Sequence, residues 1–251
     1  MRPSLLLSRL LSILLALPLL ASAQQITVST AASLTDAFKE LGPKFEASQP
    51  GATVRFNFAA SGVLLQQISQ GAPVDVFVSA DQDTMDRGAA QKLIDTDTRK
   101  DFVSNSLVLI EPGKDGLGLK SLQDLGSANV RKIAIGKVAT VPAGRYTKQV
   151  LDSAHLWTAL EPKFVQADNV RQVLDYVSRG EAEAGFVYRT DAALLGDKVK
   201  IVLTTTGHTP VSYPIAVVAD SKQKALAKNF IAFLFTDAAQ QVLARYGFGK
   251  P

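Results

Sequence analysis

Two serines stand where the sequence predicts that a strand ends and a helix begins. Ser33 follows a short β-branched strand at 27–30 and precedes an amphipathic helix whose apolar positions Leu34, Phe38 and Leu41 fall at helical spacing. The first N–H groups of a helix have no backbone partner, and the helix dipole favours negative charge there, so such a junction can bind an anion. An ordinary N-cap serine, bonded to its own helix, explains the same pattern.

Ser61 stands at a second junction of this kind. Residues 53–58 alternate apolar and polar side chains, which is typical of a strand, and a helix is expected from 63 to 68. Gly62 carries no side chain, so a ligand can approach the backbone beside Ser61 closely. Ser61 taken alone reads as a helix cap, but the recurrence of the junction favours an anion-binding site.

Three further positions supply hydrogen-bond donors at comparable places. Pro142 in the first turn of a predicted helix leaves the N–H of Ala143 free, and a cap at Asn169 leaves that of Val170 free. Tyr188 ends a buried strand, which puts its hydroxyl at the end of the sheet where open α/β folds bind ligands. Each of these residues also has an ordinary explanation, as a first-turn residue or a core tyrosine.

Strands that alternate with helices position these residues and predict an α/β fold. The sequence predicts strands at 53–58, 74–78, 131–136, 164–167, 184–188 and 198–203. Two more, at 105–110 and 213–218, are expected to connect a discontinuous first lobe to an inserted second lobe. A cleft lies between lobes joined in this way, and a pair of connections permits hinge closure. Arg145 and Arg171, beside the donor turns, are expected to be solvated or to bridge the lobes.

The first residues read as a cleaved leader. Arg2 and Arg9 precede the apolar stretch 10–20, which is too short to span a membrane comfortably, and residues 21–23 form a small-x-small cleavage site. We therefore assign residues 1–23 to a signal peptide and expect a periplasmic protein.

Composition excludes several classes of protein. The chain has 27 Lys and Arg against 23 Asp and Glu, and without the two leader arginines 25 against 23, a net charge of +2. No basic run supports nucleic-acid binding. The 251 residues contain no cysteine, so there is no disulfide, thiolate metal site or lipid-modified cysteine. With 47% hydrophobic residues, the fold is expected to hold by packing alone.

Several motifs in order resemble those of the periplasmic molybdate-binding proteins, the solute receptors of ABC importers with a type II periplasmic binding protein fold. The matching segments are 31–35, 58–62, 71–82, 141–144, 168–171, 185–188 and 245–248. The resemblance implies two lobes, each a mostly parallel sheet flanked by helices and joined by a two-strand hinge. It implies lobe boundaries at 24–104 with 215–251 for the first lobe and 105–214 for the second.

The resemblance also implies a ligand set. In the family, two serines, two backbone amides and, in one subgroup, a tyrosine hydroxyl hold the oxyanion; matched motif by motif, these are Ser33, Ser61, Ala143, Val170 and Tyr188. Molybdate is a tetrahedral dianion without a proton, so it accepts hydrogen bonds and donates none, and tungstate has nearly the same size. The molybdenum is held only as the oxyanion. The resemblance implies no cofactor, no catalytic residue, a monomer, and an inner-membrane ABC permease as partner.

Other functions remain open at this stage. The same fold could bind sulfate, phosphate or an iron-chelating anion. A periplasmic serine hydrolase is a second alternative, but there is no Gly-x-Ser-x-Gly elbow, and the two histidines, His155 and His208, are not beside a candidate nucleophile in the sequence. A regulator's effector domain is a third alternative, but the chain lacks a DNA-binding helix pair and carries an export leader.

Overall fold

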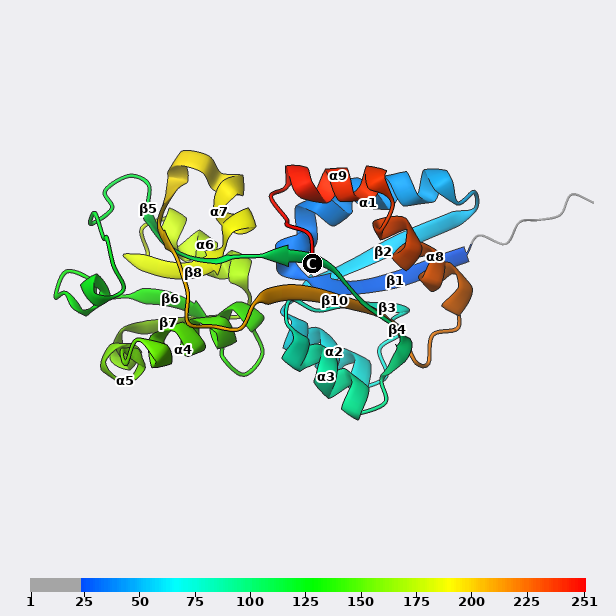
Figure 1. The fold of residues 1–251 in the computed structure, drawn as a ribbon, viewed down its shortest axis with the longest axis horizontal. Coiled ribbons are helices and arrows are strands. Elements are labelled where there is room, and N and C mark those ends of the chain that lie inside the picture. The colour runs from blue at the N-terminus through cyan, green and yellow to red at the C-terminus, as the bar shows by residue number, and fades with distance from the viewer. Residues whose placement is uncertain (1–23) are drawn as a thin grey trace, which may run out of the picture.

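The computed structural model describes residues 24–251, and the predicted leader, residues 1–23, lies outside the described residues. The chain forms two bodies, each a five-stranded sheet with helices on both faces (Figure 1). The two-lobed α/β architecture predicted from the sequence is therefore confirmed.

The first sheet has the strand order β2-β1-β3-β10-β4. Its strands are β1 Gln24–Ala31, β2 Ala52–Ala59, β3 Val76–Val78, β4 Ile94–Asn105 and β10 Val211–Val218. β10 runs antiparallel to the direction that the other four strands share. The helices over one face are α1 Thr35–Ser48, α8 Lys224–Leu234 and α9 Asp237–Arg245, and those over the other are α2 Ser61–Ser69 and α3 Gln82–Ala90 (Figure 1).

The second sheet repeats this plan with the order β7-β6-β8-β5-β9. Its strands are β5 Leu107–Pro112, β6 Ile133–Gly136, β7 Phe164–Ala167, β8 Ala184–Tyr188 and β9 Val199–Thr204, and β5 is the one that runs against its neighbours. The helices are α4 Pro142–Ser153, α5 Trp157–Leu160, α6 Val170–Ser178 and α7 Arg189–Leu195. Short 3-10 turns are η1 Ala32–Leu34, η2 Gln123–Gly126, η3 Glu161–Lys163 and η4 Gly196–Lys198.

The chain crosses between the two bodies in short segments. Residue Ser106 separates β4 from β5, and residues 205–210 lead from β9 back to β10. The strands expected to make these crossings, 105–110 and 213–218, instead pair mostly within one sheet each. The sheet to which a strand belongs does not show which lobe it would move with during hinge closure. The predicted lobe boundaries therefore stay a prediction.

Strand β4 is an element that the sequence analysis did not predict. Its residues 95–101 are mostly charged or hydroxylated, which conceals the alternation that marks a strand. The strand lies at the edge of the first sheet, where exposed charges are common because they discourage pairing with another chain.

Aromatic side chains fill the first body. Phe45 packs edge to face on Phe230 with ring centroids 5.1 Å apart, and Phe38 contacts both Phe56 and Phe230. These rings join α1 and α8 to the sheet and contribute beyond their buried area. One apolar cluster continues into the second body, where Tyr188 and Val170 belong to it. The two bodies are therefore in packed contact.

Two glycines let β6 and α4 approach closely, which fixes where the first turn of α4 lies. Gly136 ends β6, and Gly144 lies in the first turn of α4. A Cβ added at position 144 would be 2.1 Å from the carbonyl oxygen of Gly136, a backbone atom that cannot rotate away.

Gly144→Ala should therefore destabilise the protein by about 2–3 kcal/mol, because the strand and the helix would have to separate. Urea unfolding followed by circular dichroism measures the loss. Gly126→Ala is the matched control, since a Cβ there meets nothing within 4 Å. Equal unfolding midpoints for the two variants would contradict the argument.

Candidate functional site

One cavity between the two bodies is lined by all five residues that the sequence analysis singled out. About 210 Å³ of space between atoms lies within its bounds, part of it open to solvent. Its lining residues are Ala31, Ala32, Ser33, Ala59, Ala60, Ser61, Ala80, Val141, Pro142, Ala143, Asn169, Val170 and Tyr188. None of these residues carries a charge, so hydroxyl and amide groups provide the polar surface of the cavity.

Ser33 is not a helix cap. It lies in the turn η1, whose N-cap is Ala31, and no side chain caps that turn. The hydroxyl of Ser33 lies 3.0 Å from the hydroxyl of Tyr213 instead, and both residues are buried. The alternative of an N-cap bonded to its own helix is therefore wrong for Ser33.

Ser61 is likewise free of a capping role. It is the first residue of α2, whose N-cap Ala60 has no side-chain bond to the helix. Its hydroxyl oxygen accepts a hydrogen bond of 3.0 Å from the backbone N–H of Ala80. That bond uses one lone pair of Ser61, and the described residues provide no acceptor for the hydroxyl proton, which stays available for a ligand.

Ala143 and Val170 present backbone donors from the starts of α4 and α6. Pro142 occupies the first turn of α4, and the side chain of Asn169 caps α6 by accepting from the N–H groups of residues 171 and 172. Within residues 24–251, the N–H groups of Ala143 and Val170 have no protein acceptor. The two free donors expected from the cap signals are therefore present, and each carries the partial positive charge of a helix start.

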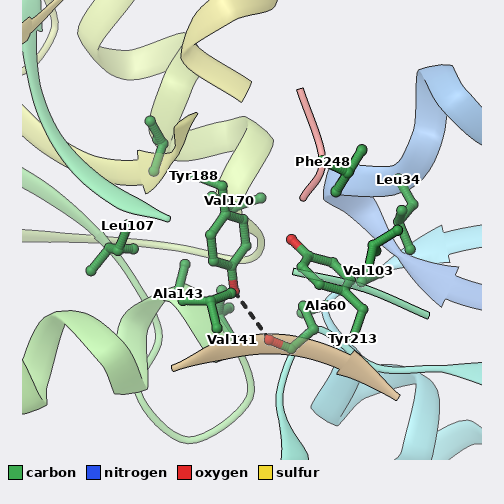
Figure 2. Close-up of a cluster of buried hydrophobic side chains, with 14 of the residues drawn as sticks. Leu34, Ala60, Val103, Leu107, Val141, Ala143, Val170, Tyr188, Tyr213 and Phe248 are labelled. Carbon is green, nitrogen blue, oxygen red and sulfur yellow. Dashed lines mark hydrogen bonds between the residues drawn. The ribbon is translucent and has the colours of Figure 1, made fainter. Parts of the chain in front are cut away.

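Tyr188 extends from the end of β8 into the space between the bodies (Figure 2). Its hydroxyl reaches the carbonyl oxygen of Ala80 at 3.5 Å, a long and weak bond that a ligand can replace. Burial raises the pKa of Tyr188 well above its usual range, with smaller contributions from Tyr213 and Tyr146. The hydroxyl therefore keeps its proton and acts as a donor.

Sequence reasoning missed Tyr213, which lies beside Tyr188 with ring centroids 5.9 Å apart (Figure 2). Tyr213 is near the start of β10 and 180 residues from its partner Ser33. A tyrosine within a predicted strand gives no local signal of such a contact, because only the sheet order brings β10 near η1.

Two arginines bridge the bodies close to the cavity. Arg145 of α4 donates to Asp81, at the start of α3, over 2.7 Å and to Thr84 over 2.6 Å. Arg171 of α6 donates to Asp36 of α1 over 2.8 Å and to the carbonyl oxygen of Ser33 over 3.2 Å. The sequence analysis expected these arginines to be solvated or to bridge the lobes, and these contacts correspond to bridging.

The backbones of the two bodies also touch. The N–H of Gly62 in α2 donates to the carbonyl oxygen of Thr140, just before α4, over 2.9 Å. A Cβ at position 62 would lie 2.7 Å from that oxygen and 2.8 Å from the Cα of Thr140. Gly62 therefore permits an approach that any side chain would block, and the structure has the cavity closed.

Across residues 24–251, no cluster of three His, Cys, Asp or Glu side chains has the geometry of a metal site. No helix in that range is long and apolar enough to cross a membrane.

A two-lobed α/β fold that closes on a cavity of neutral donors defines a periplasmic binding protein architecture. The model of the bacterial extracellular solute-binding proteins matches residues 26–249 of this chain. The protein therefore belongs to the family of bacterial extracellular solute-binding proteins, in agreement with the resemblance found in the sequence.

Individual relatives are similar over nearly the whole chain. The molybdate-binding protein ModA of Escherichia coli is 39% identical over 234 residues, which cover 91% of this chain and 90% of that protein. The putative ABC transporter substrate-binding lipoprotein YvgL of Bacillus subtilis is 39% identical over 230 residues, 89% of this chain and 85% of that protein. The solved periplasmic molybdate-binding protein of Azotobacter vinelandii superposes with a TM-score of 0.77 at 26% identity, covering 90% of this chain and 99% of that one.

The bridge at Arg171 includes a carboxyl group whose protonation should affect stability. Asp191 of α7 is fully buried and pairs with Arg171 over 2.5 Å. Burial raises the pKa of Asp191 from 3.8 to about 6, because the desolvation cost exceeds the attraction of Arg171. Between about pH 6 and pH 4 the folded protein then binds a proton that the unfolded chain does not, so this group favours folding as the pH falls.

We expect wild-type protein to gain stability relative to Asp191→Asn as the pH is lowered from 7 to 4.5, since the variant cannot titrate there. Urea unfolding at several pH values measures the difference in unfolding free energy. Asp152→Asn, an exposed position, serves as the control. A difference between wild type and Asp191→Asn that is constant over this range would show that the pKa of Asp191 is not raised.

Proposed function

We propose that this protein is the molybdate receptor of an ABC importer, which encloses the oxyanion between its lobes and delivers it to an inner-membrane permease. The name of the Escherichia coli relative at 39% identity supports this assignment, as does that of the Azotobacter vinelandii structure. The observation that carries it is the cavity lined only by uncharged residues, in which five donor groups converge.

The donor set suits an anion that has no proton. Ser33, Ser61 and Tyr188 offer hydroxyl protons, and Ala143 and Val170 offer backbone N–H groups at helix starts. A carboxylate in the lining would repel a dianion, and none is present among the lining residues. Hydrogen bonds to a charged group contribute about 1.5–3 kcal/mol each, so five of them outweigh an association cost of several kcal/mol.

The geometry gives no support to catalysis, and we propose a binding role alone. A nucleophilic serine needs an adjacent base. Neither His155 nor His208 lines the cavity, and the oxygen of Ser61 already accepts from a backbone N–H. The two serines are thus arranged as donors and lack an activating group.

Further parts of the proposal follow from the leader and the family. We propose export through the signal peptide 1–23, action in the periplasm as a monomer, and no resident cofactor. Tungstate is expected to bind as well. The site is expected to select its ligand by the ligand's shape and hydrogen-bond acceptors, and tungstate shares both with molybdate. Sulfate, which offers the same acceptors on a smaller frame, is the alternative ligand.

Calorimetric titration of the mature protein with molybdate, tungstate, sulfate and phosphate tests the assignment. We expect molybdate and tungstate to bind with micromolar or stronger affinity and the other two far more weakly. Sulfate binding that is tighter than molybdate binding would overturn the choice of ligand.

Ser61→Ala should weaken molybdate binding by about 1–3 kcal/mol, because one donor to a charged ligand is lost. The exposed Ser69→Ala, at the far end of α2, is the matched control.

Closure predicts a second effect, at Gly62. In Gly62→Ala, the new methyl group would collide with the backbone of Thr140 in the closed form only, so molybdate affinity should fall by about 10-fold or more. Small-angle scattering in saturating molybdate should give a larger radius of gyration than for wild type. Gln66→Ala on the exposed side of α2 is the control. Unchanged affinity together with an unchanged radius would mean that binding does not require this contact.

A further inference from the structure

The hydroxyl of Tyr213 lies between two polar side chains, one of which lines the cavity. On one side it is 3.0 Å from the hydroxyl of Ser33, and on the other it is 3.2 Å from Nδ2 of Asn105. Tyr213 is wholly buried and Ser33 is 3% exposed, so water does not compete for these bonds. The direction of each bond can therefore be worked out from the donors and acceptors present.

The first bond runs from Asn105 to Tyr213. Oδ1 of Asn105 accepts from the backbone N–H of Ser106 over 2.9 Å, and Nδ2 also donates to the hydroxyl of Thr190 over 2.9 Å. A backbone N–H can only donate, so the oxygen of this amide has to face Ser106 and its nitrogen has to face Tyr213. Because that nitrogen carries no lone pair to accept with, the oxygen of Tyr213 is the acceptor.

The second bond runs from Tyr213 to Ser33. Burial raises the pKa of Tyr213 well above its usual range, so the phenol keeps its proton. Among residues 24–251, the hydroxyl of Tyr213 has just two hydrogen-bond partners, and Asn105 is a donor, so the proton has to go to Ser33. The Ser33 hydroxyl then accepts from Tyr213 and keeps its own proton, for which the described part of the chain offers no acceptor.

We propose that Asn105 and Tyr213 are positioning residues: they form a relay that holds the Ser33 hydroxyl as a donor toward the bound oxyanion. The relay rests on the proposed function, since it deepens the role of Ser33 in that site. It adds a basis for selectivity, because a Ser33 hydroxyl whose proton is held toward the ligand meets the O–H of an oxyanion such as hydrogen phosphate donor to donor.

The relay also connects the site to closure. Asn105 is the last residue of β4, next to the crossing at Ser106, and its second amide proton reaches Thr190 of α7 in the other body. The amide that orients Tyr213 is thus itself fixed from both bodies. Separation of the bodies would remove the contact with Thr190 and leave the amide held by Ser106 and Tyr213.

A double-mutant cycle tests the relay. Tyr213→Phe should weaken molybdate binding about 3- to 10-fold, because the Ser33 hydroxyl loses its fixed direction and the polarising bond. In a Ser33→Ala background the same substitution should have no further effect beyond about 2-fold, because the group through which it acts is absent. An equal loss in both backgrounds would overturn the relay, since Tyr213 would then act on the site by packing.

The selectivity between molybdate and hydrogen phosphate is a quantity that a purely structural role of Tyr213 would leave unchanged. At pH 8 the ratio of molybdate affinity to hydrogen phosphate affinity should fall in Tyr213→Phe, because a freely rotating Ser33 hydroxyl can turn its proton away and present a lone pair to the O–H of the phosphate. A ratio equal to that of wild type would count against the proposal. Tyr176→Phe is the matched control: it removes a tyrosine hydroxyl that bonds Gln172 and does not line the cavity.

Two further measurements distinguish a failure of the relay from a failure of folding or of the proposed ligand. If thermal melting finds Tyr213→Phe unfolded, Asn105→Ala replaces it in the same cycle, since it removes the donor that sets the direction of Tyr213. If wild-type protein prefers sulfate to molybdate, the proposed ligand is wrong, and the cycle run with sulfate, which also carries no proton, still tests the relay.

Discussion

The structure depends on one constraint: the five groups that we propose to hold the oxyanion all have to act as hydrogen-bond donors, and none of them is charged. Protein partners help to meet this constraint by donating to the oxygens of the two serines. The N–H of Ala80 occupies the oxygen of Ser61, and the buried phenol of Tyr213 occupies that of Ser33. Buried polar groups need partners, so a hydroxyl that accepts from one protein donor and has no protein acceptor for its proton can direct that proton into the cavity. The uncharged cavity therefore presents hydrogen-bond donors to a ligand.

Closure brings these donors together, because no single body contains them all. Ser33 and Ser61 come from helix starts beside the first sheet, whereas Ala143, Val170 and Tyr188 come from the second. Gly62 lets the two backbones touch, and the short crossings between the sheets allow the bodies to move as units. A cavity made in this way exists only in the closed form, which couples enclosure of a solute to a change of shape.

Much of this arrangement could be predicted from the sequence, and the remainder depends on long-range contacts. The cap at Asn169 and the proline at 142 are local signals, so the free amides could be inferred from them. Ser33 lies in the expected junction, but its partner is 180 residues away, and no spacing in the sequence points to it. Strand β4 was missed for a related reason: its charged residues are tolerated at a sheet edge, and only the sheet order identifies that edge.

The placement of the arginines explains how a dianion can be held without cationic side chains. Arg145 and Arg171 lie beside the donor turns, yet each is paired with a carboxylate across the gap between the bodies. Their charge is therefore balanced within the protein, and the field in the cavity comes from helix starts and oriented hydroxyls. An arginine in direct contact with the anion would strengthen binding in the open and closed forms alike. The charges of Arg145 and Arg171, paired between the bodies, stabilise the closed form instead. When the bodies open, the donors of one body leave the solute, which favours its release.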